Sequence, residues 1–363
     1  MNFDLSEDQE MFKAAVERFT ESIDVEARRH IRKSDGGYDR ARWTELAELG
    51  LVALAAGEDS GGMGGSDVDL CVIGQALGAG NAVDPWLENG VLPAKLLAAG
   101  GDETHLPGVL DGSVFVAAAY AERDQRFSLT ASALQARGDG DGYILSGEKT
   151  YVQGGAIADV FLVSAKLEDG ATGWFCVPAD ARGVHASPYR LTDGSMGAEL
   201  QLRDVQVAGA AKLAISEEQL AGVVAEVKLL AAAEMAGLAD RLFKETLDYV
   251  RQREQFGVAI GSFQALQHRL VECYAALEQS QSMLWRGALA DRSDAQSWQQ
   301  QISGVKAFVA EQAMHIAREA VQMHGGMGVT DELAIGHALK RVMMLEKTFG
   351  DTNFDLNNYS EAA

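Results

Sequence analysis

One arginine and one glycine-rich stretch in the C-terminal third carry residue types suited to binding an anionic ligand. Arg253 lies just beyond a predicted helix that runs to about Tyr249, so its guanidinium is free to donate paired N–H groups to an external phosphate. Residues 322–328 end another predicted helix in a turn, and their glycines let the backbone come close to a ligand. Taken alone, a surface arginine and a helix C-cap would also explain these residues.

Three phrases in this part of the chain occur in a fixed order, and together they resemble the flavin-binding half of acyl-CoA dehydrogenases. They are Arg253–Gly257, Ser262–His268 and Gln322–Gly328. The resemblance implies FAD as the cofactor, with the matching residues reaching across a subunit interface to its pyrophosphate and adenosine. The residues that it implies for cofactor binding are Arg253, Phe256, Gln264, Gln322, Gly325 and Gly326.

The resemblance spans nearly the whole chain but departs at the flavin ring. Leu49–Gly65 resembles the N-terminal phrase of the family, and Tyr143–Ala156 resembles its β-domain signature. Within that signature, Tyr151 stands at the flavin-covering position and Gln153 at the position of a hydroxyl residue that bonds the flavin N5 edge. Tyrosine can still stack and glutamine can still donate, so both remain candidates. The loop Ala121–Arg126 lacks the glycines and hydroxyls that would present backbone to the flavin.

The expected catalytic base is missing. Dehydrogenating an acyl-CoA thioester needs a carboxylate within reach of the α-proton while flavin N5 takes hydride from the β-carbon. The two positions at which the family places this glutamate match Gly350 and Val227. Asp351 and Glu234 remain as candidate bases. Each also has a structural alternative, a helix N-terminal acid for Asp351 and a hydrogen-bonded packing residue for Glu234.

The elements that must position these residues follow the order helical, strand-rich, helical. Capping boxes at Ser6–Gln9 and Ser216–Gln219 predict helix starts, and Met11, Val16 and Phe19 share an apolar stripe of the first helix. Short β-like runs with glycine-rich turns fill the middle. The resemblance implies an α+β fold with an N-terminal helical domain (1–112), a middle β-barrel domain (113–212) and a C-terminal four-helix-bundle domain (213–363).

Composition limits the partners and the compartment. Lys plus Arg total 31 against 53 Asp plus Glu, a formal charge of -22, which disfavours nucleic-acid binding. Three widely spaced cysteines argue against a disulfide framework and fit a reducing compartment. Because the N-terminus lacks a targeting pattern and no run of about 20 apolar residues occurs, we expect a cytoplasmic protein without a membrane span. The histidines form no helical ligand pair, so no metal site is expected.

The missing base leads to the main functional hypothesis. The family includes heterotetrameric bacterial enzymes of the steroid or pimeloyl-CoA type, whose smaller subunit ends in a Phe-Gly-Asp phrase and lacks the base, as at residues 349–351 here. The chain resembles that subunit, which implies an oxidoreductase of CH–CH groups in fatty acid or steroid degradation that is inactive without its partner. The implied partners are an acyl-CoA substrate, a homologous larger subunit and an electron-transfer flavoprotein.

Three alternatives remain open at this point. The first is a self-sufficient homomeric acyl-CoA dehydrogenase that uses Asp351 or Glu234 as base. The second is a flavin monooxygenase on the same fold, which needs no α-proton base. The third is a non-catalytic stabilising subunit that holds no flavin.

Overall fold

The computed structural model describes residues 4–360. Residues 1–3, which belong to the N-terminal stretch expected to lack a targeting signal, and residues 361–363 of the expected C-terminal domain lie outside this range. The described chain forms two compact units. One comprises residues 4–30, 66–82 and 224–360, and the other comprises residues 31–65 and 83–223.

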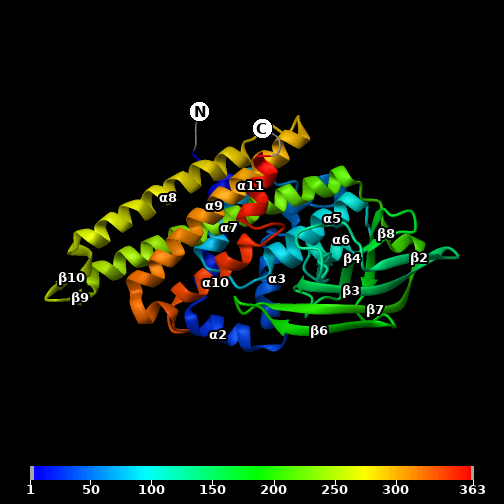
Figure 1. The fold of residues 1–363 in the computed structure, drawn as a ribbon, viewed down its shortest axis with the longest axis horizontal. Helices are drawn as coiled ribbons and strands as arrows, with labels where there is room; N and C mark the ends of the chain where they lie inside the picture. The colour runs from blue at the N-terminus through cyan, green and yellow to red at the C-terminus, as the bar shows by residue number, and fades with distance from the viewer. Residues whose placement is uncertain (1–3, 361–363) are drawn as a thin grey trace. The chain divides into compact units, whose positions relative to one another are not determined.

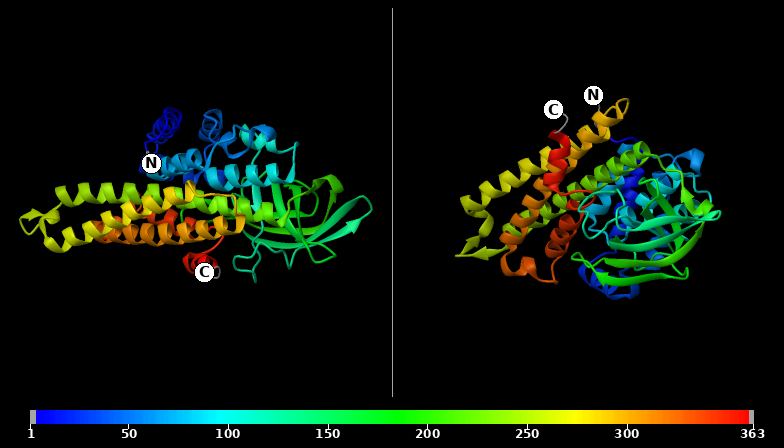
Figure 2. Two further views of the ribbon diagram at one scale, coloured as in Figure 1. Left: turned by 90° about the horizontal axis from the view of Figure 1, so that it is seen from above. Right: turned by 45° about the vertical axis from the view of Figure 1, so that its right-hand side comes forward.

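The first unit is almost entirely helical. Its long helices run side by side, and α9 lies against α8, α10 and α11 (Figures 1 and 2). The elements that lie wholly or mostly in this unit are α1 (Glu7–Thr20), α2 (Val25–Lys33), α4 (Asp67–Ala79), α7 (Glu217–Gln252), β9 (Glu254–Gln255), β10 (Val258–Ala259), α8 (Gln264–Ala288), α9 (Ala295–His324), α10 (Ala334–Glu346) and α11 (Thr352–Ser360).

Helix starts and buried stripes in this unit follow from local sequence. Ser6 caps α1 as expected, because its hydroxyl accepts from the Gln9 backbone while the Gln9 side chain accepts from the Ser6 backbone. Of the residues on the apolar stripe, Val16 and Phe19 are buried, whereas Met11 is 62% exposed. The apolar positions of α9 that recur every three or four residues between 305 and 320 are all buried.

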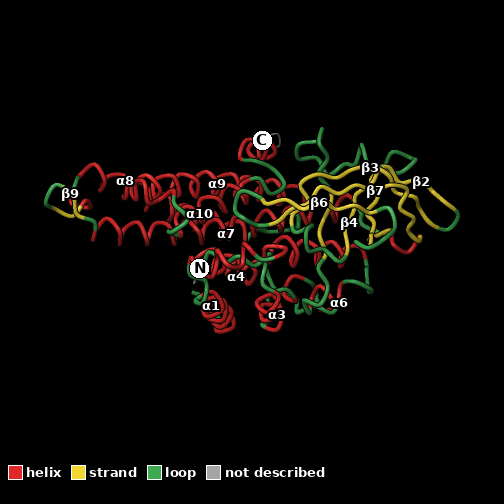
Figure 3. The backbone as a smooth tube through the Cα atoms, turned by 90° about the horizontal axis from the view of Figure 1, so that it is seen from below, coloured by secondary structure: helices red, strands yellow, loops and turns green. Residues whose placement is uncertain are grey.

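The second unit is built around a sheet with three helices, α3 (Arg40–Glu48), α5 (Leu92–Gly100) and α6 (Leu106–Leu110). Its strands are β1 (Val116–Ala119), β2 (Gln135–Asp139), β3 (Gly142–Gln153), β4 (Val160–Lys166), β5 (Thr172–Pro178), β6 (Val184–Arg190), β7 (Met196–Ala208) and β8 (Lys212–Leu213). They lie in the order β6-β7-β3-β2-β4-β5-β8, with β1 parallel to β4. Figure 3 shows them as one curved sheet. Alternating residues such as Phe161, Phe175 and Leu200 form its buried core.

The helical, strand-rich, helical order along the chain is confirmed. The boundaries at residues 112 and 212 stay a prediction, because the compact units divide the N-terminal helices between them. No helix within residues 4–360 is both long enough and apolar enough to cross a membrane.

Candidate functional site

The first group of predicted cofactor residues lies on a hairpin that follows α7. Gln255 pairs with Val258, so Phe256 and Gly257 form a two-residue turn. Both have positive φ, 57° and 81°, as a type I′ turn requires. Glycine adopts this backbone without strain but phenylalanine does not, and the Phe256 side chain is 93% exposed. The hairpin, which is labelled β9 and β10 in Figure 1, therefore carries an exposed aromatic ring at its turn.

A small apolar cluster brings the three predicted phrases together. Val250 of α7, Leu270 of α8 and Met323 of α9 form its buried centre. Tyr249 packs on this centre and stacks on the ring of His324, with the ring centroids 4.2 Å apart. The first phrase follows α7, the second begins α8 and the third ends α9. The cluster thus gathers three sequence segments at one end of the helical unit.

The polar side chains at this end are available to a ligand. Arg253, Gln264 and Gln322 are all exposed. Among residues 4–360, none of these three side chains forms an ion pair or a hydrogen bond. An exposed guanidinium and two amides fit the phosphate oxygens and polar edges of a dinucleotide.

Gly325 and Gly326, in the third phrase, differ in whether the structure of the chain requires glycine at their positions. Gly325 caps α9 at φ 60° and ψ -139°, a conformation that favours glycine. Gly326 has no such backbone requirement, and a Cβ atom added there would meet no described atom within 4 Å. Nothing among residues 4–360 therefore explains Gly326, whereas a ligand or a second chain lying over it would.

Tyr151 and Gln153 belong to the strand-rich unit. Tyr151 has a φ of 53° and lies in an irregularity where the pairing of β3 with β7 shifts between Lys149 and Val152. Its backbone N–H donates to the Tyr189 phenol, and burial and Glu199 still raise the pKa of that phenol. Gln153 pairs with Gly197 at the end of β3, and its side chain is half-buried. Their flavin roles stay predictions.

The loop Ala121–Arg126 is anchored in its own unit. The buried Glu122 carboxylate accepts from the backbone N–H groups of residues 132–134 and from the Lys149 ammonium at 2.8 Å. Burial alone would raise the pKa of Glu122, but Lys149 and the backbone donors outweigh it and lower that pKa to about 2. Sequence reasoning missed this pair, although Lys149 lies within the β-domain signature. The loop holds part of the sheet together, in keeping with the expectation that it lacks the glycines and hydroxyls of a flavin-binding loop.

Glu234, the first candidate base, is held by an arginine. Arg341 donates from Nε to Oε1 at 2.6 Å and from Nη2 to Oε2 at 3.0 Å. Both side chains are nearly buried, with 7% and 8% exposed. Since each carboxylate oxygen already accepts a charge-assisted hydrogen bond, the packing alternative accounts for Glu234. Its role as a base stays a prediction.

Asp351, the second candidate base, stands at the start of α11. Its Oδ1 accepts from the Phe354 backbone N–H at 2.9 Å, which is the geometry of a helix N-cap. The Lys347 ammonium lies 3.7 Å from Oδ2, and the residue is 7% exposed. This matches the structural alternative of a helix N-terminal acid.

The two positions predicted to match the family's glutamate, Val227 and Gly350, carry no carboxylate in this chain. Val227 is 1% exposed in the core of the helical unit. Gly350 has a φ of 148°, and an added Cβ would lie 2.6 Å from Cδ1 of Phe354. A side chain at Gly350 therefore requires the start of α11 to shift.

Behind this turn lies a buried charge cluster that sequence reasoning missed. Lys306 donates to Asp355 Oδ2 at 2.7 Å and to the Gly350 carbonyl at 2.8 Å. Lys228 donates to Asp355 Oδ1 at 2.6 Å. Burial lowers the pKa of Lys306, and Asp355 offsets only part of that effect. These contacts tie α7 and α9 to α11 and fix the turn that carries Asp351.

A second unexpected group lies in the strand-rich unit. Asp102 Oδ2 lies 2.9 Å from His105 Nδ1 and 3.5 Å from Cys176 Sγ. Burial raises the pKa of Cys176 well above its ordinary value, and the Asp102 charge adds to the shift. Sequence reasoning considered only pairs of histidines on one helix and short cysteine spacings. It could not find a group whose members come from a turn and a distant strand.

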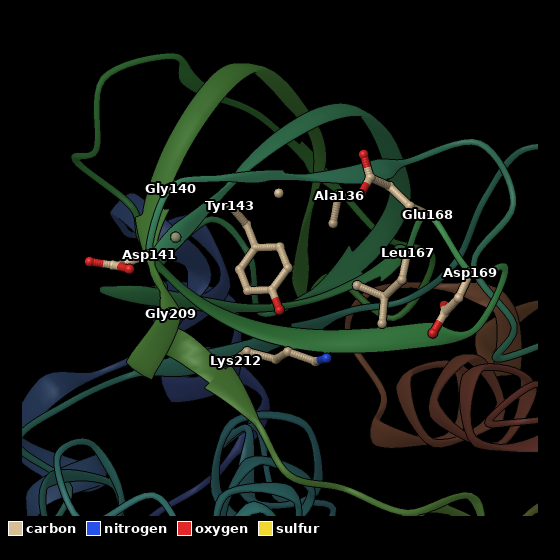
Figure 4. Close-up of a pocket in the computed structure, with 11 residues that line it drawn as sticks. Ala136, Gly140, Asp141, Tyr143, Leu167, Glu168, Asp169, Gly209 and Lys212 are labelled. Atoms are coloured by element: carbon tan, nitrogen blue, oxygen red, sulfur yellow. The ribbon is translucent and has the colours of Figure 1, made fainter.

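A pocket of about 470 Å³ opens at the β2–β3 hairpin of the same unit. Figure 4 shows the Tyr143 ring and the Lys212 side chain directed into it, and the ammonium lies 5.7 Å from the ring centroid. None of the residues expected to bind FAD lines this pocket. It therefore gives no support to a flavin site.

Comparison with known proteins covers all three parts of the chain. The family model described as "Acyl-CoA dehydrogenase, N-terminal domain" matches residues 6–112, the corresponding middle-domain model matches residues 117–205, and the C-terminal-domain model matches residues 222–363. The acyl-CoA dehydrogenase FadE27 of Mycobacterium tuberculosis is 30% identical over 361 residues, which cover 96% of this chain and 93% of the relative.

Solved structures agree in fold. A steroid ACAD variant, Tcur3481-Tcur3483, has a TM-score of 0.87 and 29% identity, covering 98% of this chain and 97% of that one. The ChsE4-ChsE5 complex from Mycobacterium tuberculosis has a TM-score of 0.89 and 26% identity, covering 99% and 98%. A glutaryl-CoA dehydrogenase from Mycobacterium smegmatis in complex with FADH2, 23% identical, shares the fold with a TM-score of 0.88, covering 99% and 95%.

Proposed function

We propose that this chain, which belongs to the acyl-CoA dehydrogenase family, is the base-lacking subunit of a heteromeric, FAD-dependent acyl-CoA dehydrogenase. It binds the adenosine and diphosphate end of a shared FAD, and a homologous larger subunit supplies the carboxylate that removes the α-proton of an acyl-CoA. An electron-transfer flavoprotein is the electron acceptor that the family implies.

The single observation that carries the proposal is the gathering of three exposed phrases at one end of the helical unit, with Gly326 among them. Gly326 leaves open space that no atom in the described part of the chain fills within 4 Å of an added Cβ. The Phe256 ring, at the same end of the helical unit, is exposed at an unfavourable φ. An accessible backbone surface and an exposed aromatic ring at the same end of the unit fit a planar nucleotide at a boundary between chains.

The charge at this end fits the diphosphate. The Arg253 guanidinium is exposed and has no ion-pair partner within the described part of the chain. It can therefore donate two parallel N–H groups to phosphate oxygens. Because the chain carries a formal charge of -22, such a local cation is needed to bind an anionic cofactor.

The two candidate bases of this chain, Glu234 and Asp351, are poorly arranged to accept the substrate proton. When bound, FAD supplies the hydride acceptor for the β-carbon. A general base must keep a carboxylate oxygen free to reach the α-proton. Glu234 has both oxygens on Arg341, and Asp351 caps α11. The proposal therefore assigns proton removal to the partner.

Assembly with a homologous partner is supported by the kind of structures that this chain resembles. The ChsE4-ChsE5 structure is a complex, and the Tcur3481-Tcur3483 protein is a steroid ACAD. We extend both features to this chain as part of the proposal, with an acyl-CoA that carries a bulky group, such as a steroid, as its substrate.

The test is co-expression with a homologous subunit that carries a glutamate at the position matching Val227. We expect the complex to hold FAD and to reduce an electron acceptor with acyl-CoA, whereas each chain alone does neither. Changing Arg253→Ala should release FAD from the complex. Arg251→Ala is the matched control, because Arg251 is an exposed arginine at the end of the same helix.

Three results would contradict the proposal, each in favour of a different function. Stoichiometric FAD and turnover in the lone chain, abolished by Asp351→Asn or Glu234→Gln, would show a self-sufficient dehydrogenase. Oxygen-dependent product formation with a separate flavin reductase would show a monooxygenase. If Arg253→Ala does not change the FAD content of the complex, this chain does not bind the cofactor and is a stabilising subunit.

A further inference from the structure

We propose that Asp102, His105 and Cys176 form a binding site for Zn²⁺ or a similar borderline divalent metal ion. Their three ligand atoms, Oδ2, Nδ1 and Sγ, all lie within 4.8 Å of one another. The site lies wholly in the strand-rich unit and contains none of the residues assigned to the flavin or to the substrate.

Backbone contacts orient two of the three ligands, Asp102 and Cys176. Asp102 lies in the turn between α5 and α6, and its Oδ1 accepts from the backbone N–H groups of Thr104 and His105. These bonds leave Oδ2 to face the imidazole and the thiol. Cys176 is fixed on β5 by pairing with Leu162 of β4. Preorganised ligands reduce the ordering cost of binding an ion.

Two of the three distances between ligand atoms lie at or near those around a tetrahedral ion. Metal–ligand bonds of about 2.0 Å to nitrogen or oxygen and about 2.3 Å to sulfur put neighbouring ligand atoms roughly 3.3 to 3.7 Å apart. The distance from Asp102 Oδ2 to Cys176 Sγ, 3.5 Å, already falls in this range. The distance from Oδ2 to His105 Nδ1, 2.9 Å, would lengthen slightly when an ion replaces the hydrogen bond.

The charges and ligand types also select the ion. A carboxylate, a thiolate and a neutral imidazole carry two negative charges, which neutralise a divalent cation. On binding, the Cys176 thiol gives its proton to solvent, since the thiolate is the ligand. A sulfur and a nitrogen ligand favour Zn²⁺ or Co²⁺ over Mg²⁺ and Ca²⁺, which prefer oxygen.

The site has access and an open position. The His105 side chain is 23% exposed, whereas that of Asp102 is 8% exposed, so an ion can arrive from the histidine side. Three protein ligands leave a fourth position for water or another small ligand. A bound ion would cross-link the α5–α6 turn to β5 and so stabilise the strand-rich unit.

The experiment uses the full-length protein, stripped with a chelator and titrated with Zn²⁺ or Co²⁺. We expect one ion per chain after gel filtration, a higher melting temperature with Zn²⁺, and Co²⁺ absorption bands in the red, where oxidised flavin does not absorb. Cys176→Ser should weaken binding at least about tenfold and remove the thiolate contribution to the spectrum. Cys273→Ser is the matched control, because Cys273 is also buried and free.

Two results would overturn the inference. One is the absence of stoichiometric metal in the wild-type protein. The other is a Co²⁺ spectrum that Cys176→Ser and His105→Gln leave unchanged. If Cys176→Ser does not fold, His105→Gln replaces it, because the His105 side chain is partly exposed and can be changed with less effect on the core. The melting temperature of the metal-free His105→Gln variant, compared with that of the metal-free wild type, shows whether the change affects folding as well as metal binding.

Discussion

Arg341 holds both carboxylate oxygens of Glu234, at 2.6 and 3.0 Å, between helices α10 and α7. The partners are 107 positions apart in the chain. From the sequence alone, Glu234 is a candidate base. In the structure it is half of a buried ion pair that links two helices. A buried pair of this kind contributes little net stability when intact but is costly to break.

Glu234→Gln should therefore destabilise the protein strongly, because it leaves the Arg341 charge buried without its counter-ion. We expect a loss of about 3 kcal/mol or more in the free energy of unfolding, measured by urea denaturation. The double variant Glu234→Leu with Arg341→Met is the control and should lose less than the single change. A stability within about 0.5 kcal/mol of wild type would show that the pair is not buried as described.

Gly326→Ala should separate ligand binding from folding. Its backbone φ is ordinary for any residue and its Cβ would enter open space, so the free energy of unfolding of the lone chain should not fall. In the complex with its partner, the methyl group should weaken FAD binding at least about tenfold, measured by flavin fluorescence.

Gly325→Ala provides the contrast for that prediction. Its φ of 60° and ψ of -139° strain any other residue, so this change should cost roughly 1 to 3 kcal/mol even in the lone chain. If Gly326→Ala leaves both FAD binding and assembly at the wild-type level, the open space above Gly326 is not a contact surface.

Glu122 should make the stability of the protein sensitive to acid. Its pKa falls from an ordinary 4.5 to about 2 in the folded chain, so the folded state binds fewer protons than the unfolded state. The stabilisation is fully present above pH 4.5 and is lost as the pH falls toward about 2. Its size is roughly 3 kcal/mol.

The pH profile of unfolding tests this assignment. Glu122→Gln should lower stability at neutral pH and flatten the fall in the free energy of unfolding below pH 4.5. Asp124→Asn, an exposed carboxylate of the same loop, should leave the profile unchanged. Equal profiles for wild type and Glu122→Gln would mean that Lys149 does not hold this carboxylate.

Gly350→Glu should not restore a catalytic base to the lone chain. The added Cβ would lie 2.6 Å from Phe354 and 3.0 Å from Asp355 Oδ1, at a φ of 148°. We expect a loss of at least about 2 kcal/mol in stability and no acyl-CoA turnover. Gly140→Glu is the control, because Gly140 also has a positive φ but an added Cβ there meets open space. Its smaller loss of stability measures the backbone strain without the clash. Turnover by the Gly350→Glu chain would show that the α11 turn can open.

Features that depend on neighbouring residues were predictable from the sequence. The capping box of Ser6 with Gln9, the buried stripe of α9 and the strands of the middle region follow from periodicity and short-range hydrogen bonds. Met11 shows what periodicity cannot predict. Periodicity identifies the apolar face of a helix, but not how much of that face the neighbouring elements cover.

The three phrases that contain Arg253, Gln264 and Gln322 can be identified from the sequence alone. The sequence also shows that residues 227 and 350 are not glutamate. Only the tertiary structure decided which groups meet. Packing joined Glu234 to Arg341, Glu122 to Lys149, and Asp102 to Cys176 across 74 positions. Contacts between such distant residues depend on how helices and strands pack, and no local pattern records that packing.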